Sequence, residues 1–141
     1  MLDVNVVVDV IQRREPFFRA STRLLSTVAA GQLEGCFASY GLTTLYYVVN
    51  RHTNKARAAE AVDWVLDNLE IVPQDHATFV RARSLRLSDF EDAVLASTAE
   101  DATCERIVTR NVKDFDGSPV LAITPGELLV LLGTAFDPPE G

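Results

Sequence analysis

The chain has 141 residues, of which 48% are hydrophobic and 23% are charged, the composition of an ordinary single globular domain. A chain of this length should bury roughly 68–70% of the surface that its unfolded form exposes, so its core needs no disulfide or structural metal. Twenty acidic residues against 13 Lys and Arg give a net charge of -7, the opposite of a surface that grips nucleic acid through phosphates. A nucleic-acid substrate would therefore need another source of positive charge, such as a divalent cation or a basic partner segment.

The cysteines and the N-terminus indicate the cellular setting. Cys36 and Cys104 show no metal-ligand spacing, and we expect two buried thiols in a reducing cytoplasm, with a chance disulfide as the alternative. The start of the chain lacks the features of a signal peptide, and no run approaches the ~18 apolar residues of a membrane span. We therefore predict a cytoplasmic protein that has no contact with a membrane.

The first half of the chain predicts a strand, a helix, a second strand and two more helices. The β-branched run from Val4 to Ile11 is too continuous for a half-exposed strand and predicts a strand buried on both faces of a parallel sheet. Helical spacing follows from Phe17 until Gly31, which ends an amphipathic helix. A short strand is then expected within 33–39, and helices over 42–49 and 58–69.

The second half continues this alternation. We expect strands over 70–73, 106–109 and 120–123, and helices over 77–87 and 90–103. Thr124-Pro125-Gly126-Glu127 has the residues of a helix start and predicts a last helix that runs to Leu132. Strands that alternate with helices predict an α/β protein, a three-layer α/β/α sandwich with a central parallel sheet. Residues 1–132 would form this single domain, and residues 133–141 a C-terminal tail.

Polar residues near the predicted strand ends are the candidates for a functional site, because open parallel sheets bind ligands at the carboxyl ends of their strands. Asp3 stands beside a run of valines, where a carboxylate must be paired, protonated or metal-bound. The two-residue period of a strand would place Asn5 on the same face. A solvated, inert acid at a frayed terminus is the alternative.

A second candidate segment is Ser88-Asp89-Phe90-Glu91-Asp92, at the start of a predicted helix. Ser88 and Glu91 fit a capping box, and Asp89 offsets the helix dipole. Capping does not explain Asp92, which shares a helix face with Leu95 and so points toward packed structure. Asp89 and Asp92 lie one turn apart, close enough to serve one site.

A third segment follows the predicted strand 106–109 and contains Thr109-Arg110-Asn111 and Lys113-Asp114-Phe115. Turn formation is the alternative explanation of its Asn and Asp residues. The parallel sheet would bring all three segments to one edge, and such an oxygen-rich cluster suits magnesium or manganese. A metal there would polarise a phosphoryl oxygen and activate a water, which is the chemistry of phosphodiester cleavage. His52 and His76, both expected to be exposed, offer no competing catalytic arrangement.

Four pieces of the sequence carry a resemblance to a known family. They are Leu2-Asp3-Val4-Asn5-Val6, Arg14-Glu15-Pro16-Phe17, Asp89-Phe90-Glu91-Asp92-Ala93, and Ile107-Val108-Thr109-Arg110-Asn111 with Lys113-Asp114-Phe115. In order and spacing they resemble the PIN-domain ribonucleases, which include the VapC-type toxins of toxin–antitoxin pairs, over nearly the whole chain. The resemblance implies a PIN-like α/β/α sandwich and metal-dependent cleavage of RNA.

The resemblance also implies roles for individual residues. It makes Asp3 and Asp92 the catalytic, metal-binding acids for Mg²⁺ or Mn²⁺, and we expect Asp114 or Asp89 to complete the metal shell, directly or through water. It makes the following residues accessory groups that position water or phosphate: Asn5, Asp89, Thr109 and Asn111. Two positions depart from the family, because Thr44 stands where many members carry glutamate and Asn111 where many carry aspartate. Either Asp114 takes over the missing charge, or the site is short of ligands.

These observations predict a metal-dependent endoribonuclease, a hydrolase that acts as the toxin of a toxin–antitoxin pair. Its expected partners are RNA, an antitoxin protein and a second copy of the chain in a homodimer. The two departures favour one alternative, a PIN-like module that binds RNA or protein without cutting. A receiver domain lacks its phospho-accepting aspartate on a middle strand here, and an aspartate phosphatase would need a second acid where Asn5 stands.

Overall fold

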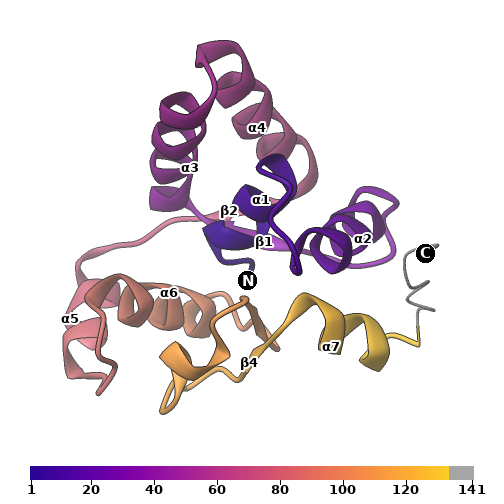
Figure 1. The fold of residues 1–141 in the computed structure, drawn as a ribbon. Coiled ribbons are helices and arrows are strands. Elements are labelled where there is room, and N and C mark those ends of the chain that lie inside the picture. The colour runs from indigo at the N-terminus through magenta and orange to yellow at the C-terminus, as the bar shows by residue number, and fades with distance from the viewer. Residues whose placement is uncertain (134–141) are drawn as a thin grey trace.

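The computed structural model describes residues 1–133, so the expected tail, Gly133 apart, lies outside the described residues. Short parallel strands run through the centre of the molecule (Figure 1). β1 (Cys36–Ala38) pairs with β2 (Glu70–Val72), and β3 (Ile107–Val108) pairs with β4 (Ala122–Ile123). The N-terminus joins the two pairs, because the Leu2 amide donates to the Cys36 carbonyl at 2.9 Å and Leu2 forms a parallel bridge with Val108. The order is therefore β2, β1, the N-terminal segment, β3 and β4.

The valine-rich segment is a helix, α1 (Val4–Ile11), and the predicted strand there is wrong. Only the residues before it are extended, and Asp3, with φ -72° and ψ 145°, is its N-cap. α1 packs against both α2 (Phe18–Ala29) and α3 (Ser39–His52). α1 is short and contains only two polar residues, so its run of valines resembles a buried strand, although Asn5 and Asp9 stand one helical turn apart.

The other helices lie close to their expected ranges. α3 and α4 (Lys55–Asn68) form a hairpin on one side of the strands. On the other side lie α5 (His76–Ser84), α6 (Phe90–Asp101) and α7 (Pro125–Leu131), as Figure 1 shows. A short 3-10 helix, η1 (Val112–Phe115), follows β3. Helices on both sides of a parallel sheet confirm the predicted α/β/α architecture.

The helix starts show which capping predictions hold. The Thr124 hydroxyl accepts the Glu127 amide at 3.2 Å, as expected for the start of α7. At α6 the expected cap at Ser88 is wrong, because Asp89 is the N-cap and its Oδ1 accepts the Asp92 amide at 3.1 Å. Asp89 therefore fixes the first turn of the helix that carries Asp92.

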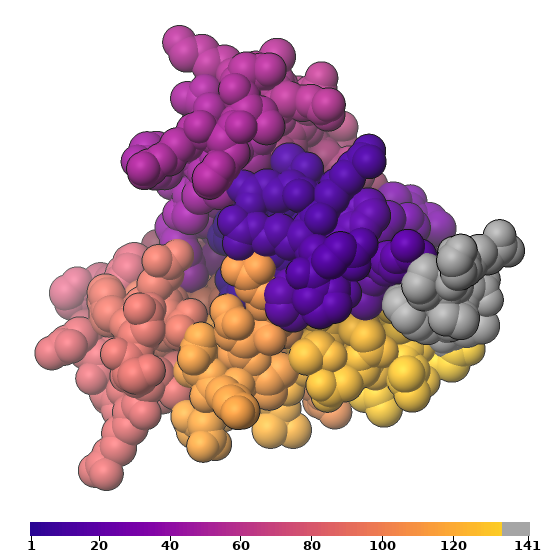
Figure 2. Space-filling model, in the orientation of Figure 1, coloured from indigo at the N-terminus to yellow at the C-terminus, as the bar shows by residue number. Residues whose placement is uncertain are grey.

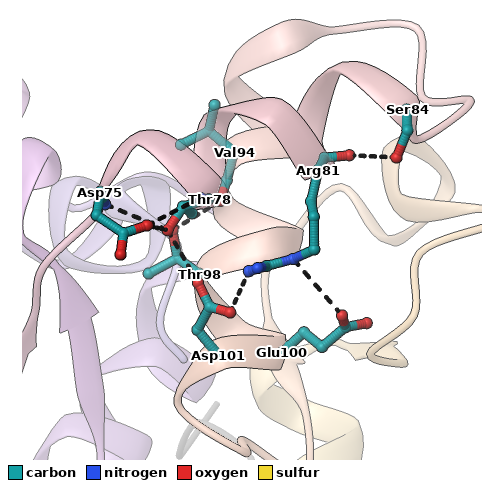
Figure 3. Close-up of polar contacts among 8 residues, drawn as sticks. All are labelled: Asp75, Thr78, Arg81, Ser84, Val94, Thr98, Glu100 and Asp101. Carbon is teal, nitrogen blue, oxygen red and sulfur yellow. Dashed lines mark hydrogen bonds and ion pairs between the residues drawn. The ribbon is translucent and has the colours of Figure 1, made fainter.

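A polar network fastens α5 to the end of α6 (Figure 3). The hydroxyl of the buried Thr78 lies 2.9 Å from Oδ2 of Asp101 and 3.0 Å from Oδ1 of Asp75, which caps α5. Arg81 forms an ion pair with the same Asp101. Because α6 carries Asp92 at its other end, this network helps to hold the candidate site in place.

The two cysteines meet although 68 positions separate them in sequence. Their Sγ atoms lie 3.0 Å apart as free thiols, and the disulfide alternative is not formed. Cys36 is buried, but Cys104 is only half-buried, which corrects the prediction of two buried thiols. Among residues 1–133, no helix combines the length and apolar character needed to cross a membrane.

Candidate active site

Asp3 lies at the carboxyl end of the N-terminal segment and is held by groups from two elements. Its Oδ2 accepts the Thr109 hydroxyl at 2.9 Å and the Asn5 amide Nδ2 at 3.2 Å. Asn5 Nδ2 also lies 3.3 Å from Thr109 Oγ1, which closes a triangle of side chains. Asn5 therefore does meet Asp3 as predicted, but through the first turn of a helix and not through the period of a strand.

Asp92 reaches the same site from the first turn of α6. A small cavity of about 20 Å³ is lined by both carboxylates together with Tyr40 and Glu91. That volume holds about one water-sized occupant. Figure 2 shows a hollow in the surface where the N-terminal segment meets α3 and the α5–α6 region. The N-terminal segment and α6 thus place two acids around one small space.

Electrostatic repulsion is strong at this site. Burial, and after it the charges of four neighbouring acids, raises the pKa of Asp92 to about 7; these acids are Asp89, Asp3, Asp114 and Glu91. Burial also raises the pKa of Asp3, although the Thr109 hydrogen bond opposes the rise. Asp114 is exposed on η1, yet its charge reaches Asp92. The other three predicted acids, Asp3, Asp89 and Asp114, are therefore all within electrostatic range of Asp92.

The donor set fits a hydrated divalent cation. No group of three or more His, Cys, Asp or Glu side chains within residues 1–133 is placed to hold a metal ion. Magnesium, however, is commonly held by one or two carboxylates and several waters. Asp3 and Asp92 supply two carboxylates, and Oδ1 of Asn5 is a buried oxygen without a hydrogen-bond partner among the described residues. Mutual repulsion of the acids would be relieved by such a cation.

The two positions that depart from the family flank this site. Thr44 is half-buried on α3, one helical turn beyond Tyr40, which lines the cavity. Asn111 is exposed, and its backbone amide donates to Thr109 Oγ1 at 3.1 Å. Thr44 is thus on the helix that carries Tyr40, and Asn111 bonds the threonine that holds Asp3. His52 and His76 are exposed, as predicted.

Sequence reasoning missed three residues near the site. Tyr40 is the second residue of α3, and its pKa is raised by burial and then by the charge of Glu91. Glu91 itself was explained as a helix cap, yet it lines the cavity. Asp9 has no exposed surface and pairs with Arg110, Nη1 to Oδ1, at 2.6 Å. An acid within a run of valines was the available signal for Asp9, since burying a lone charge is costly.

Acids gathered beyond the ends of parallel strands define an α/β protein with an acidic pocket suited to a cation. Residues 1–113 match the family model of the PIN domain. The chain belongs to the PIN-domain family, as its resemblance implies.

Known relatives and structures are similar over most of the chain. The ribonuclease VapC1 of Aquifex aeolicus (strain VF5) is 27% identical over 131 residues, which cover 89% of this chain and 90% of that protein. VapBC2 from Rickettsia felis, bound to a DNA fragment from its promoter, has a similar fold at 23% identity and a TM-score of 0.66, covering 88% of this chain and 96% of that one. DNA-bound VapBC from Salmonella typhimurium has the same TM-score at 19% identity, covering 89% and 96%.

Proposed function

We propose that this PIN-domain protein is a Mg²⁺- or Mn²⁺-dependent endoribonuclease. The observation that carries the proposal is the single small cavity lined by the carboxylates of Asp3 and Asp92. The similarity to a relative named as a ribonuclease supports the same substrate class. The net charge of -7 agrees with a site that relies on a cation to approach phosphate.

The proposed roles follow from the contacts of each side chain. Asp3 and Asp92 would hold a divalent cation, with Asp114 acting through water, and such a cation would supply neutralisation of the phosphate charge and activation of a water. Thr109 and Asn5 hold the Asp3 carboxylate in one orientation through their hydrogen bonds to Oδ2. Asp89 orients Asp92 by capping α6. We also propose that Thr109 and Asn111 help to position water or phosphate.

The test is cleavage of a fluorescent single-stranded RNA with Mg²⁺, with Mn²⁺ and with EDTA. We expect cleavage only with metal, and a loss of at least about 100-fold in Asp3→Asn and Asp92→Asn. Asp67→Asn, an exposed acid on α4, is the matched control and should cleave as the parent does. Cleavage in EDTA, or full activity in Asp92→Asn, would contradict the proposal.

A module that binds RNA without cutting is the second candidate. The observations that favour it are the neutral residues Thr44 and Asn111 and the finding that no three-ligand group occurs in residues 1–133. Fluorescence anisotropy with labelled RNA separates the two functions. RNA that binds in the presence of Mn²⁺ but stays intact would favour the binding module over the nuclease.

We also propose an antitoxin-type protein partner. The solved structures with a similar fold include toxin–antitoxin complexes. An apolar groove of about 340 Å³ between α1, α2 and α4 is lined by Val10, Leu25 and Trp64, among others, and suits an amphipathic helix of such a partner. Co-expression with a product encoded beside this chain, followed by light scattering, tests the assembly. Trp64→Glu should prevent the assembly with that protein. If the chain alone forms a homodimer that Trp64→Glu disrupts, the groove is occupied by a second copy of the chain and not by an antitoxin.

A further inference from the structure

The turn after β3 and the start of α2 bring an arginine side chain, Arg110, against an aromatic ring, Phe17. The Arg110 guanidinium carbon lies 5.4 Å from the centre of the Phe17 ring. Phe17 precedes α2 and is 38% exposed, and Arg110 directly follows Thr109, whose hydroxyl binds Asp3. In Figure 2 the N-terminal segment lies against the segment around residue 110, so these elements meet at the surface. An Arg–aromatic pair thus stands one residue away from the acidic site.

Arg110 is held rigidly and retains donors. Its Nη1 bonds the buried Asp9, and within residues 1–133 its guanidinium makes no other hydrogen bond. A guanidinium has five N–H donors, and the Arg110 side chain keeps 21% of its surface exposed. A side chain that is already ordered loses little rotamer entropy when a ligand binds it. Arg110 is therefore prepared to accept an anionic group.

Two arginines lie near Asp9 in an otherwise acidic chain. The charges of Arg110 and Arg14 lower the pKa of Asp9, against the rise that burial and the charge of Asp3 cause. The guanidinium of Arg110 is therefore a positive group held next to the acidic site. The acids of the site would repel RNA phosphates, and the guanidinium of Arg110 beside them would attract a phosphate and so favour RNA binding.

We propose that Phe17 and Arg110 form a nucleotide subsite next to the acidic site, where the exposed ring stacks on one RNA base and the guanidinium binds an adjoining phosphate. Stacking of bases on aromatic rings and on guanidinium planes is the common way in which proteins hold single-stranded RNA. The subsite rests on the proposed ribonuclease function and adds to it a preference for unpaired RNA, since a paired base is not free to stack on Phe17.

Phe17→Leu tests the stacking half of the subsite, since it removes the ring and keeps apolar bulk. With single-stranded RNA of about eight nucleotides, we expect KM to rise about tenfold and kcat to stay unchanged. Phe17→Tyr should restore the parental KM. Phe79→Leu is the matched control, because Phe79 is 41% exposed on α5, beside Thr78 and so toward the far end of α6 from Asp92.

A second readout separates stacking from a structural effect. A series of RNAs is used in which each member lacks the base at one position. The parent should bind more weakly to the RNA that lacks the stacked base, and the affinity of Phe17→Leu should not depend on whether that base is present. Binding is measured by anisotropy in an Asp92→Asn background, where the RNA stays intact. If Phe17→Leu binds and responds as the parent does, the stacking role is overturned.

Asp9→Asn/Arg110→Gln tests the phosphate contact without changing the net charge or leaving a buried carboxylate unpaired. We expect the slope of log affinity against log salt to fall by about 0.7, the value of one phosphate contact on a single strand. An unchanged slope would overturn the role of Arg110. If the parent neither binds nor cuts RNA, the ribonuclease proposal fails and the subsite fails with it. If the parent binds RNA and the Phe17 and Arg110 variants bind it equally well, only the subsite fails.

Discussion

Arg110 Nη1 lies 2.6 Å from Oδ1 of Asp9, and this ion pair joins the turn after β3 to α1. Asp9 has no exposed surface, so its charge depends chiefly on the ion pair with Arg110, with a smaller effect of Arg14. Removing one member of a buried pair commonly costs about 3–5 kcal/mol, because the other is left buried and charged. We therefore expect Arg110→Gln to lower the free energy of unfolding by about that amount near neutral pH.

The pH dependence of that loss identifies its cause. Without Arg110 the pKa of Asp9 rises further, so the penalty of the buried charge should shrink as the pH falls and Asp9 takes up a proton. Asp9→Asn/Arg110→Gln should recover most of the lost stability. Urea unfolding at about pH 5 and about pH 8 measures both effects, and a loss that is independent of pH would contradict this account.

Asp92 should make the metal-free protein less stable as the pH rises. Its pKa is about 7 in the folded chain against an ordinary value of 3.8, so the folded state binds the proton more tightly than the unfolded state. The stabilising contribution is complete below 3.8 and is lost as the pH rises through about 7. Asp92→Asn, neutral throughout, should stabilise by on the order of 1 kcal/mol at about pH 8, after allowance for solvent screening, and should not stabilise at about pH 3. Thermal melts across this range give the comparison.

Divalent metal should stabilise the parent by relieving the repulsion between the acids. At a concentration of ~100 times the dissociation constant, linkage contributes about 2.7 kcal/mol. The Tm should rise with Mn²⁺ or Mg²⁺ in the parent and in the control Asp67→Asn, and it should stay unchanged in Asp3→Asn. Equal shifts in Asp3→Asn and the parent would show that Asp3 is not a ligand.

The neutral residues at the two family departures should weaken metal binding. An amide offers one neutral oxygen where a carboxylate offers charge and a second oxygen. Asn111→Asp, alone or with Thr44→Glu, should therefore tighten Mn²⁺ binding and increase RNA cleavage. Titration calorimetry alongside an RNA cleavage assay decides the matter. Unchanged affinity in both variants would place these positions outside the metal shell, and tighter binding without cleavage would favour the binding module.

The network in Figure 3 offers a stability test with an internal control. Thr78→Val removes a buried hydroxyl that bonds carboxylates of two different elements, and hydrogen bonds to charged groups contribute about 1.5–3 kcal/mol. Thr98→Val is the control, because the equally buried Thr98 hydroxyl bonds only the Val94 carbonyl of its own helix. We expect a loss of about 2 kcal/mol for Thr78→Val in urea unfolding and little change for Thr98→Val. Equal losses would mean that the interhelical bond is not the source.

Only part of the candidate site was predictable. Asp92 begins a predicted helix and Asp114 follows a predicted strand, and a parallel sheet brings such positions to one edge. The strand predicted over Val4–Ile11 would have placed Asp3 at its amino end, and Asp3 lies at a carboxyl end only because the extended segment stops before α1. The capping residue at α6 was misplaced by one position, from Ser88 to Asp89. Helix boundaries depend on backbone angles that several neighbouring polar residues can satisfy, so sequence alone separates them poorly.

Local sequence determined the alternation of strands and helices, the amphipathic faces of α2 and α4, and the residue types available for chemistry. Tertiary structure decided that Val4–Ile11 is a helix, because a run of valines this short fits either a buried strand or a buried helix and packing against α2 and α3 selects between them. It also decided the partners that lie far apart in sequence. Arg110 on Asp9, Thr109 on Asp3 and the neighbouring thiols of Cys36 and Cys104 join positions 68 to 106 residues apart. No local pattern encodes such pairs, since each arises only when separate elements pack against one another.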